Sequence, residues 1–357
     1  MKDKVLTILF TIYITIFMVI NIIVHDKDIS YTERRRLTTF PKVNINSILD
    51  ASFFNKIDKY VSDQFILRDE YRSLKSFVAF NIFKNTDNNK VFILDNNAYK
   101  IEYPLKESNI DKNINKINSI INSFNKEMNV YYSIIPDKSY FLNSDKYLKL
   151  DYDYLIKLYN DSINGKYIDI TAKLTIEDYY KTDPHWREEN IDKIANILVS
   201  NMNNKYIKQE YKETFIGKFL GSYYNEILIN LEEDDLVYLS NEILDNVKIS
   251  YLENEKLSTV YNINNYNSID PYSIYLDGAT SFVEIENNKS ISNKELIIFR
   301  DSYGSSIVPL MIPYYKKLTI VDIRYMKSDL ISSKINYEDQ DVLFLYSTLI
   351  LNGNSFK

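Results

Sequence analysis

The chain has 357 residues, 45% of them hydrophobic and 26% charged, which is typical of globular proteins and excludes a wholly disordered chain. Its formal net charge of -6 argues against a nucleic-acid-binding protein that depends on a basic surface. The sequence contains no cysteine and only two histidines, His25 and His185, which excludes disulfides, thiolate metal sites and a tri-histidine metal site within one chain. Since the glycine-rich motifs that cradle phosphates are also missing, we expect no cofactor.

The N-terminal segment is apolar enough to cross a membrane. Residues 5–24 carry no charge, and at about 1.5 Å per residue they match a hydrocarbon core of about 30 Å. A cleavable signal peptide is the alternative, but it would have a shorter apolar core and small residues at a cleavage site, which this segment lacks. We therefore predict an uncleaved membrane anchor over residues 1–26.

The charges around the span do not settle its orientation. Lys2 and Lys4 precede it, whereas Lys27 and the arginines at 34–36 follow it, and this bias alone mildly favours a cytoplasmic C-terminal part. The head before the span is too short for its charges to carry much weight. The absence of cysteine fits an exported protein, and the resemblance described below implies that the rest of the chain lies outside the cytoplasm.

Residues 27–85 are predicted to form an extended stalk followed by a helical pair. Helices are expected over 51–65 and 68–83. The second helix has apolar residues on one face: Tyr71, Leu74, Phe77, Val78 and Ile82.

Residues 86–357 have the pattern of an α/β domain. Strands are predicted over residues 90–95, 130–136 and 166–170, and amphipathic helices over 108–128 and 186–202. The last of these helices is expected to carry Glu188 and Glu189 in its first turn, where the helix dipole favours acidic side chains.

The C-terminal half of this domain contains two contrasting patterns. Residues 205–290 have short tyrosine-rich runs without a helical period, which predicts a β-rich insertion. Residues 294–347 alternate apolar strands with helices, which is typical of a parallel sheet built from right-handed crossovers.

Candidate site residues follow three of the predicted strands, at the sheet edge where ligand sites form in such folds. Ser302 lies at a strand-to-helix turn, and the helix that starts at Tyr303 and Gly304 offers backbone N–H groups to an oxyanion. Arg324 and Tyr346 end two further strands and are additional candidates for substrate or oxyanion binding.

Structural roles for the same residues are the alternative interpretation. Asp301 or Ser302 could simply cap the following helix. Arg324 could form a surface ion pair, and Tyr346 could be a core residue.

A second candidate element is the loop Asp183-Pro184-His185. Pro184 keeps the loop out of helical geometry, so the Asp183 carboxylate can reach Nδ1 of His185 and leave Nε2 to take a proton from a serine. The alternative is a surface histidine beside a capping aspartate. His185 is the one histidine outside the anchor, so a histidine base in this domain has to be His185.

Several segments resemble the DHHW protein family, in the same order. Residues 179–191, YYKTDPHWREENI, are similar to its TDHHW-type signature, with Pro184 where the first histidine usually stands. The resemblance covers nearly the whole chain after the anchor. The other matching segments are ERRRLTTFP (33–41), DQFILRDEYRSLK (63–75), FRDSYGSSIVPLM (299–311) and VDIRY (321–325), and the segment with Tyr272, Tyr275 and Gly278 is also family-like.

The resemblance has implications for fold and site. This family in turn resembles the SGNH-hydrolase-like proteins of alginate O-acetylation, which implies a three-layer α/β/α fold. Because the Asp-x-His pair precedes the serine, the sheet is expected to be circularly permuted relative to ordinary SGNH esterases. The resemblance implies Ser302 as nucleophile, His185 as base and Asp183 as the residue that orients it. It identifies no asparagine for the oxyanion hole.

The resemblance also implies a function. It indicates a membrane-anchored extracytoplasmic O-acetyltransferase that acts on a cell-surface or exported polysaccharide through an acetyl-serine intermediate. A membrane-bound O-acyltransferase partner is expected to deliver the acetyl group across the membrane. Two alternatives stay open: a carbohydrate acetylesterase with the same triad, and a non-catalytic member that binds polysaccharide or scaffolds an acetylation complex.

Overall fold

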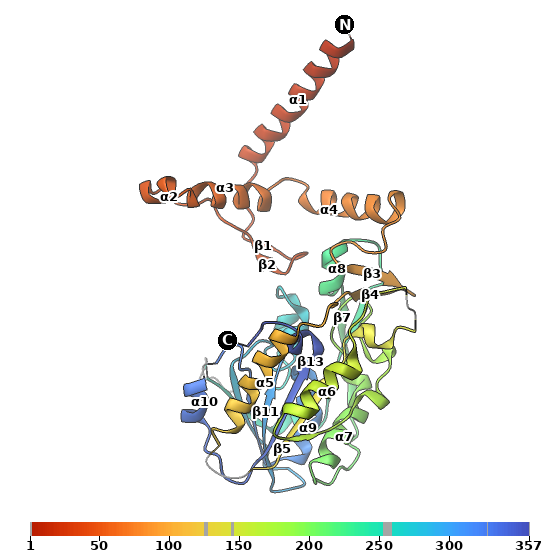
Figure 1. The fold of residues 1–357 in the computed structure, drawn as a ribbon, viewed down its shortest axis with the longest axis vertical. Coiled ribbons are helices and arrows are strands. Elements are labelled where there is room, and N and C mark those ends of the chain that lie inside the picture. Colours follow the sequence, from red (N-terminus) through yellow and green to blue (C-terminus); the bar gives the residue numbers. More distant parts are fainter. Residues whose placement is uncertain (1, 125–127, 144–145, 253–258, 327, 357) are drawn as a thin grey trace. The chain divides into compact units, whose positions relative to one another are not determined.

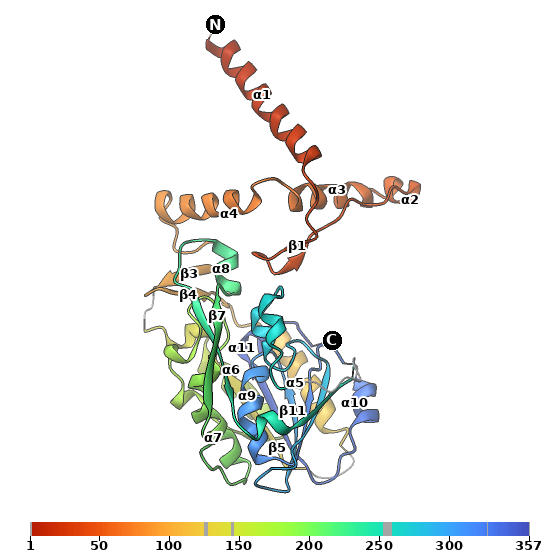
Figure 2. The same ribbon diagram turned by 180° about the vertical axis from the view of Figure 1, so that it is seen from behind.

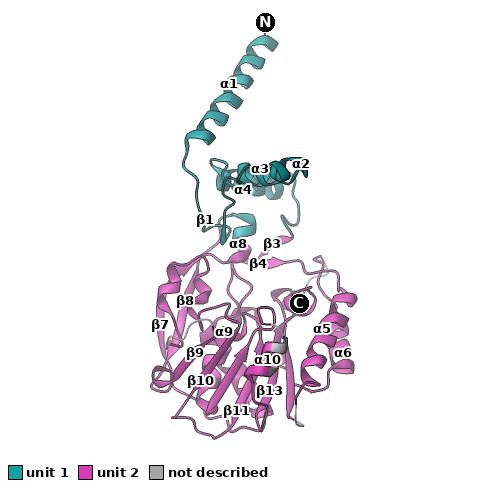
Figure 3. Ribbon diagram, turned by 90° about the vertical axis from the view of Figure 1, so that its left-hand side faces the viewer, with its two compact units in different colours: residues 1–89, 224–230 teal, residues 90–223, 231–357 magenta. Residues whose placement is uncertain are grey.

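The structure, a computed structural model, describes residues 2–356 except 125–127, 144–145, 253–258 and 327. The chain forms two compact units (Figure 3). Unit 1 contains residues 1–89 and 224–230, and unit 2 contains residues 90–223 and 231–357. Figures 1 and 2 show their elements from opposite sides.

Unit 1 begins with the long apolar helix α1 (Lys2–Ile23). An 18-residue stretch within residues 3–23 has a mean hydropathy of 2.4 and is not buried, so this helix is long and apolar enough to cross a membrane, as a signal sequence would also be. A short hairpin follows, made of β1 (Ile29–Ser30) and β2 (Arg35–Arg36).

Three helices complete this part of unit 1 and run crosswise to α1 in both views (Figures 1 and 2). They are α2 (Ile45–Leu49), α3 (Ser52–Asp63) and α4 (Arg68–Phe77), the last extended by a π-helical turn over Val78–Ile82. The predicted helices over 51–65 and 68–83 are therefore confirmed.

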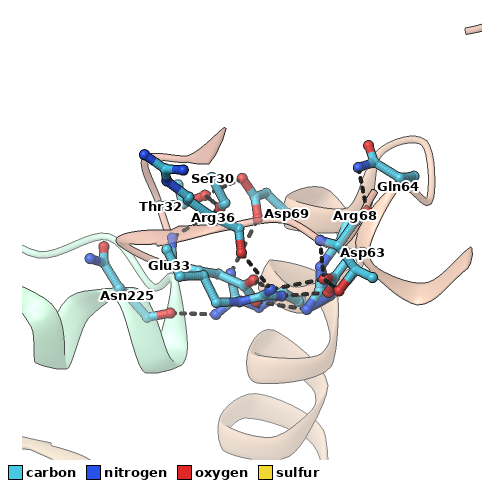
Figure 4. Close-up of polar contacts among 12 residues, drawn as sticks. Ser30, Thr32, Glu33, Arg36, Asp63, Gln64, Arg68, Asp69 and Asn225 are labelled. Carbon is cyan, nitrogen blue, oxygen red and sulfur yellow. Dashed lines mark hydrogen bonds and ion pairs between the residues drawn. The ribbon is translucent and has the colours of Figure 1, made fainter. Parts of the chain in front are cut away.

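An ion-pair cluster joins the hairpin to these helices (Figure 4). Arg35 donates two hydrogen bonds to Asp63, at 2.9 and 2.6 Å, and Arg68 donates to Glu33 at 2.7 Å. The arginine beside it holds the pKa of Asp63 well below its usual range. The two family-like segments 33–41 and 63–75 thus meet in one cluster.

Unit 2 is built on a seven-stranded sheet with the strand order β6-β5-β13-β11-β12-β10-β9. The first five strands in this order are parallel to their neighbours, and the predicted parallel pairing of the segments 295–300 and 318–324 is confirmed. The strands are β5 (Val130–Ile135), β6 (Lys166–Tyr167), β9 (Lys248–Tyr251), β10 (Phe282–Glu286), β11 (Glu295–Arg300), β12 (Lys317–Val321) and β13 (Asp341–Ser347).

Helices cover both faces of this sheet, which gives three layers. Successive strand residues point to opposite faces, so Leu296 and Ile298 pack into one core and Ile297 and Phe299 into the other. The first core also contains α7 (Asp192–Asn201) and α9 (Gly304–Met311). The second contains α5 (Glu107–Ile121), α6 (Tyr152–Ser162) and α10 (Ser328–Lys334).

Residues 205–290 differ from the predicted insertion. β7 (Lys212–Phe219) and β8 (Asp234–Ser240) form a separate hairpin, but β9 and β10 belong to the main sheet and pair antiparallel at its edge. The sheet is therefore mixed rather than purely parallel. Short strands of this kind carry too little periodicity to reveal which sheet they join.

The helix predicted over 186–202 starts later, at Asp192. Glu188 lies before it and is buried, where its carboxylate accepts hydrogen bonds from the Leu239 amide at 2.9 Å and the Tyr261 hydroxyl at 3.0 Å. Burial raises the pKa of Glu188 well above its usual range. The remaining elements are β3 (Val91–Leu94), β4 (Asn97–Lys100), α8 (Ser222–Ile227) and α11 (Thr348–Leu351).

Candidate active site

Ser302 lies in the turn between β11 and α9, at the carboxyl end of the sheet. The buried Asp301 organises this turn, since its carboxylate accepts hydrogen bonds from the Tyr303 amide at 3.0 Å and from the Ser347 amide and hydroxyl at 2.8 and 2.6 Å. Ser347 ends the neighbouring strand β13, so Asp301 ties the two strand ends together. Ser302 itself is partly exposed.

The loop around His185 meets this turn. His185 Nε2 is 2.8 Å from Ser302 Oγ, although 117 residues separate the two in the sequence. His185 Nδ1 is 2.5 Å from Asp183 Oδ1, and the Ser222 amide donates to Asp183 Oδ2 at 2.8 Å. Asp183 is fully buried, whereas His185 is partly exposed. The structure therefore brings Ser302, His185 and Asp183 together.

This order of groups suits acyl transfer. A histidine that donates Nδ1–H to a buried carboxylate presents an unprotonated Nε2 to the serine hydroxyl and can accept its proton. Both distances lie in or close to the range of ordinary hydrogen bonds.

Aromatic side chains hold the His185 ring in place. Tyr272 stacks on it with the ring centroids 4.0 Å apart, and Tyr303 lies on it at a tilt, at 4.8 Å. Tyr303 donates its hydroxyl to the Pro184 carbonyl at 2.7 Å, and Trp186 Nε1 donates to the Tyr303 carbonyl at 3.0 Å. In the sequence, Tyr272 is noted only as part of a segment that resembles the family. No pattern in the sequence predicts that its ring stacks on His185.

Two of the predicted oxyanion candidates are engaged within the turn. The Tyr303 amide donates to Asp301 Oδ1, and the Gly304 amide donates to the Asp301 carbonyl at 3.0 Å, so neither is offered to a substrate oxygen. Gly304 is explained by packing, because a Cβ there would lie 2.6 Å from Cβ of Arg300. Among the residues that the structure describes, we find no acceptor for the Ser302 amide.

Arg324 and Tyr346 have structural environments. Arg324 donates to the buried Asp322 at 2.6 Å, and Tyr346 is buried against Phe356. The structure thus places Arg324 in a largely buried ion pair and Tyr346 in the core, and a role of either in substrate binding stays a prediction. Arg300 was not predicted as a site residue. Its side chain is buried and donates to the Gly278 carbonyl at 3.1 Å. Burial lowers the pKa of its guanidinium.

Two buried groups that support the His185 loop, Asp234 and Lys138, were not predicted from the sequence. Asp234 accepts hydrogen bonds from the amides of Lys181 and Thr182, at 2.7 and 2.8 Å. Lys138 donates Nζ to the carbonyls of Tyr180 and Lys181, at 2.7 and 2.8 Å. Burial lowers the pKa of Lys138 to about 7, although the carboxylates of Asp234 and Asp183 oppose that change. Both groups are distant from the loop in the sequence and belong to no motif.

Within the described residues, no group of three or more His, Asp or Glu side chains is placed to hold a metal ion.

The fold is similar to that of several solved proteins. A DHHW family protein from Eubacterium siraeum matches with a TM-score of 0.61 at 21% identity, over 74% of this chain and 91% of that one. Bacillus cereus PatB1, solved with a sulfonyl adduct, matches with a TM-score of 0.60 at 18% identity, over 75% and 97%. The O-acetyltransferase domain of Pseudomonas putida AlgJ is more distant, with a TM-score of 0.45 at 10% identity, over 73% and 92%.

No protein-family model and no curated protein matches the sequence. The resemblance to the DHHW family that the motifs indicate is confirmed by these structural neighbours, at the level of the fold.

Proposed function

We propose that this chain is a membrane-anchored, extracytoplasmic O-acetyltransferase that acts on a cell-surface polysaccharide. The observation that carries the proposal is the contact of His185 with Ser302 on one side, at 2.8 Å, and with Asp183 on the other, at 2.5 Å. The fold shared with PatB1 supports it, because that protein has been solved with a sulfonyl adduct and sulfonyl reagents typically modify activated serine hydroxyls.

In the first half-reaction, Ser302 Oγ attacks the carbonyl carbon of an acetyl donor while His185 Nε2 takes the hydroxyl proton. Asp183 stabilises the imidazolium that forms. The bond between the acetyl carbon and the donor's leaving group breaks, the leaving group receives the proton from His185, and acetyl-Ser302 remains. The Ser302 amide is our candidate to stabilise the oxyanion.

In the second half-reaction, a sugar hydroxyl attacks acetyl-Ser302. His185 takes the proton of that hydroxyl and returns it to Ser302 Oγ when the acyl–serine bond breaks, which leaves an acetylated sugar and free enzyme. A membrane-bound O-acyltransferase is the proposed source of the acetyl group, because one span cannot carry it across a membrane.

The proposed arrangement assigns residues 1–26 to the anchor, 27–85 to the stalk and helical pair, and 86–357 to the catalytic domain. The sheet of that domain is proposed to be permuted relative to ordinary SGNH esterases, since Asp183 and His185 precede Ser302.

The proposal is tested by acetyl transfer from nitrophenyl acetate to a soluble oligosaccharide, with mass spectrometry of the acceptor and photometry of nitrophenol release. Wild-type protein should acetylate the acceptor, and Ser302→Ala should stop both signals. Ser305→Ala is the matched control, because this serine is buried in α9 and its hydroxyl has no hydrogen-bond partner in the described structure.

The outcomes separate the alternatives. Nitrophenol release that depends on Ser302 without any transfer to the acceptor would favour an acetylesterase, in which water replaces the sugar. Release by Ser302→Ala at the wild-type rate would exclude the covalent mechanism and leave a polysaccharide-binding or scaffolding role.

A further inference from the structure

Helix α4 in unit 1 presents its apolar side to the outside. We define the apolar stripe as Leu67, Tyr71, Leu74, Phe77 and Ile82, whose exposed fractions lie between 39% and 61%. Their spacing of mostly three and four residues places them along one side of the helix and of the π-helical turn that follows it. A soluble protein would be expected to turn such a stripe towards its core.

The polar side of the same helix faces inwards instead. Arg72 donates to the Asn225 carbonyl at 2.5 Å, and Ser73 donates to the Leu228 carbonyl at 3.0 Å. Ser76 is buried and accepts a hydrogen bond from Asn88 Nδ2 at 2.7 Å. These contacts fix the rotation of α4 about its own axis, so the exposure of the stripe is built into unit 1.

The ion-pair cluster reinforces this orientation (Figure 4). Asp69, on the inward side of α4, accepts a hydrogen bond from Thr32 of the hairpin at 2.5 Å. Arg68 and Arg72 both approach Glu33, at 2.7 and 3.4 Å. Turning the stripe inwards would break all of these contacts.

The stripe is continuous with α1. The hydroxyls of Tyr71 and Tyr13 lie 3.3 Å apart, and Phe65 stacks on Phe17 with the ring centroids 6.3 Å apart. Tyr13 lies about 15 Å along α1 from its end at Ile23, by the rise of an α-helix. The stripe therefore faces the side of unit 1 along which helix α1 extends.

We propose that α4 is an interfacial helix whose apolar stripe lies in the lipid bilayer beside the span. This inference rests on the membrane anchoring proposed above. If α1 spans the bilayer, the side faced by the stripe is occupied by lipid, and an amphipathic helix beside the span buries its apolar face among the acyl chains below the headgroups.

Charge supports lipid as the occupant. The exposed lysines Lys75 and Lys84 flank the stripe, where Lys84 and the Lys75 ammonium, which donates to Asn89 at 3.1 Å, can reach phosphate headgroups and offset the exposed Glu70 on the same side. Residues 25–89 contain 11 Lys and Arg against 9 Asp and Glu, in a chain whose net charge is -6. The crosswise helices α2 and α3 add further exposed apolar side chains, namely Ile45, Leu49, Phe54 and Val61.

The absence of native cysteine permits a direct test on the full-length protein. Leu74→Cys is labelled with an environment-sensitive fluorophore, and Phe215→Cys is the matched control, since these apolar residues of α4 and β7 are 55% and 57% exposed. Both proteins are reconstituted into vesicles of phosphatidylcholine and phosphatidylglycerol, and flotation reports attachment. Phe77→Cys provides a second site on the stripe.

The proposal predicts that labels at Leu74 and Phe77 are quenched by lipid-attached doxyl groups and become several-fold less accessible to aqueous iodide in vesicles, whereas the label at Phe215 stays accessible. Stripe labels as accessible as the Phe215 label, in protein that floats with vesicles, would overturn it. Shielding in native membranes but not in pure vesicles would overturn it too, in favour of a protein partner.

The readout is independent of catalysis. Lipid quenching of the Leu74 label in a Ser302→Ala background that has lost acetyl transfer would support the inference. If the wild-type protein shows no acetyl transfer but its Leu74 label is quenched by lipid, the interfacial helix is supported and the proposed chemistry is not. Protein that does not float would overturn both the anchoring and the interfacial helix.

Discussion

Helices α4 and α5 have the same kind of sequence and opposite surroundings. In α5, the apolar residues Ile110, Ile114 and Ile117 are 0–6% exposed, whereas Tyr71, Leu74 and Phe77 of α4 are 39–55% exposed. Helical periodicity predicts an apolar stripe in both cases. The difference teaches that the period identifies the stripe but not the surface that covers it.

Different kinds of interaction stabilise the folded form of the two units. In unit 2, the isoleucines of α5 pack on strand residues such as Tyr132 and Ile134. In unit 1, buried and half-buried polar groups around Glu33 and Asp63 hold the helices, and apolar side chains stay outside. Substitutions should therefore affect the two units in opposite ways.

The largest expected effect concerns the proposed chemistry, whose residues Ser302, His185 and Asp183 all lie in unit 2. Asp183→Asn should lower kcat for nitrophenyl acetate by about 10⁴-fold with little change in KM, because the amide no longer fixes the imidazole tautomer. Membrane attachment through unit 1 should persist. Asp161→Asn, at an exposed carboxylate of α6, is the control and should keep the wild-type rate. Wild-type kcat in Asp183→Asn would remove Asp183 from the mechanism.

Matched truncations test the two stripes themselves. Ile114→Ala should lower the free energy of unfolding by about 2–5 kcal/mol, because it leaves a cavity under α5. Leu74→Ala should change it by less than about 0.5 kcal/mol in detergent, since more than half of that residue is exposed. Urea denaturation followed by far-UV circular dichroism measures both. Equal losses would contradict the difference between the helices.

Buried charge in unit 2 predicts a stability that changes with pH. Lys138 has a folded pKa of about 7, against 10.5 ordinarily, so between these values the unfolded chain holds a proton that the folded chain has lost. Stability should rise with pH over this window, by about 1 kcal/mol per pH unit, and be independent of Lys138 below it. Lys138→Met should flatten the slope. An unchanged slope between pH 7 and 9 would show that Lys138 does not titrate there.

Unit 1 should respond in a different window, in acid, with the same sign: its stability also rises with pH. Arg35 keeps the pKa of Asp63 below its ordinary value of 3.8, so the carboxylate stabilises the hairpin above that pH and loses this effect as the pH falls further. Amide hydrogen exchange should show the hairpin residues opening in acid. Asp63→Asn should expose them to exchange already at neutral pH, and equal protection in both proteins would argue against the cluster as the clamp.

Much of the fold followed from local patterns. The run 294–347 alternates strands and helices strongly enough to predict the parallel strands β11, β12 and β13. The short strands β9 and β10 could not be assigned to a sheet, because their pairing with β12 depends on long-range contacts. Glu188 looked like a helix-start residue, yet tertiary hydrogen bonds bury it before the helix begins.

The site was predictable only in part. Ser302 and the Asp183–His185 pair could be singled out because strand ends meet at one sheet edge and because the chain has so few histidines, and the family resemblance implied their catalytic roles. The same reasoning overestimated Tyr303 and Gly304, whose amides close the turn. Lys138, Asp234 and the stacking of Tyr272 could not be foreseen, since each depends on contacts between distant segments.

The central claim is that Ser302 is a nucleophile activated by His185. Its most direct test is labelling of the intact protein with a sulfonyl fluoride, followed by mass spectrometry of the whole chain and of its peptides. We predict one adduct, on Ser302, with Ser302→Ala unlabelled and His185→Ala labelled far more slowly. An adduct on another residue, or labelling of Ser302 at the same rate without His185, would contradict the claim.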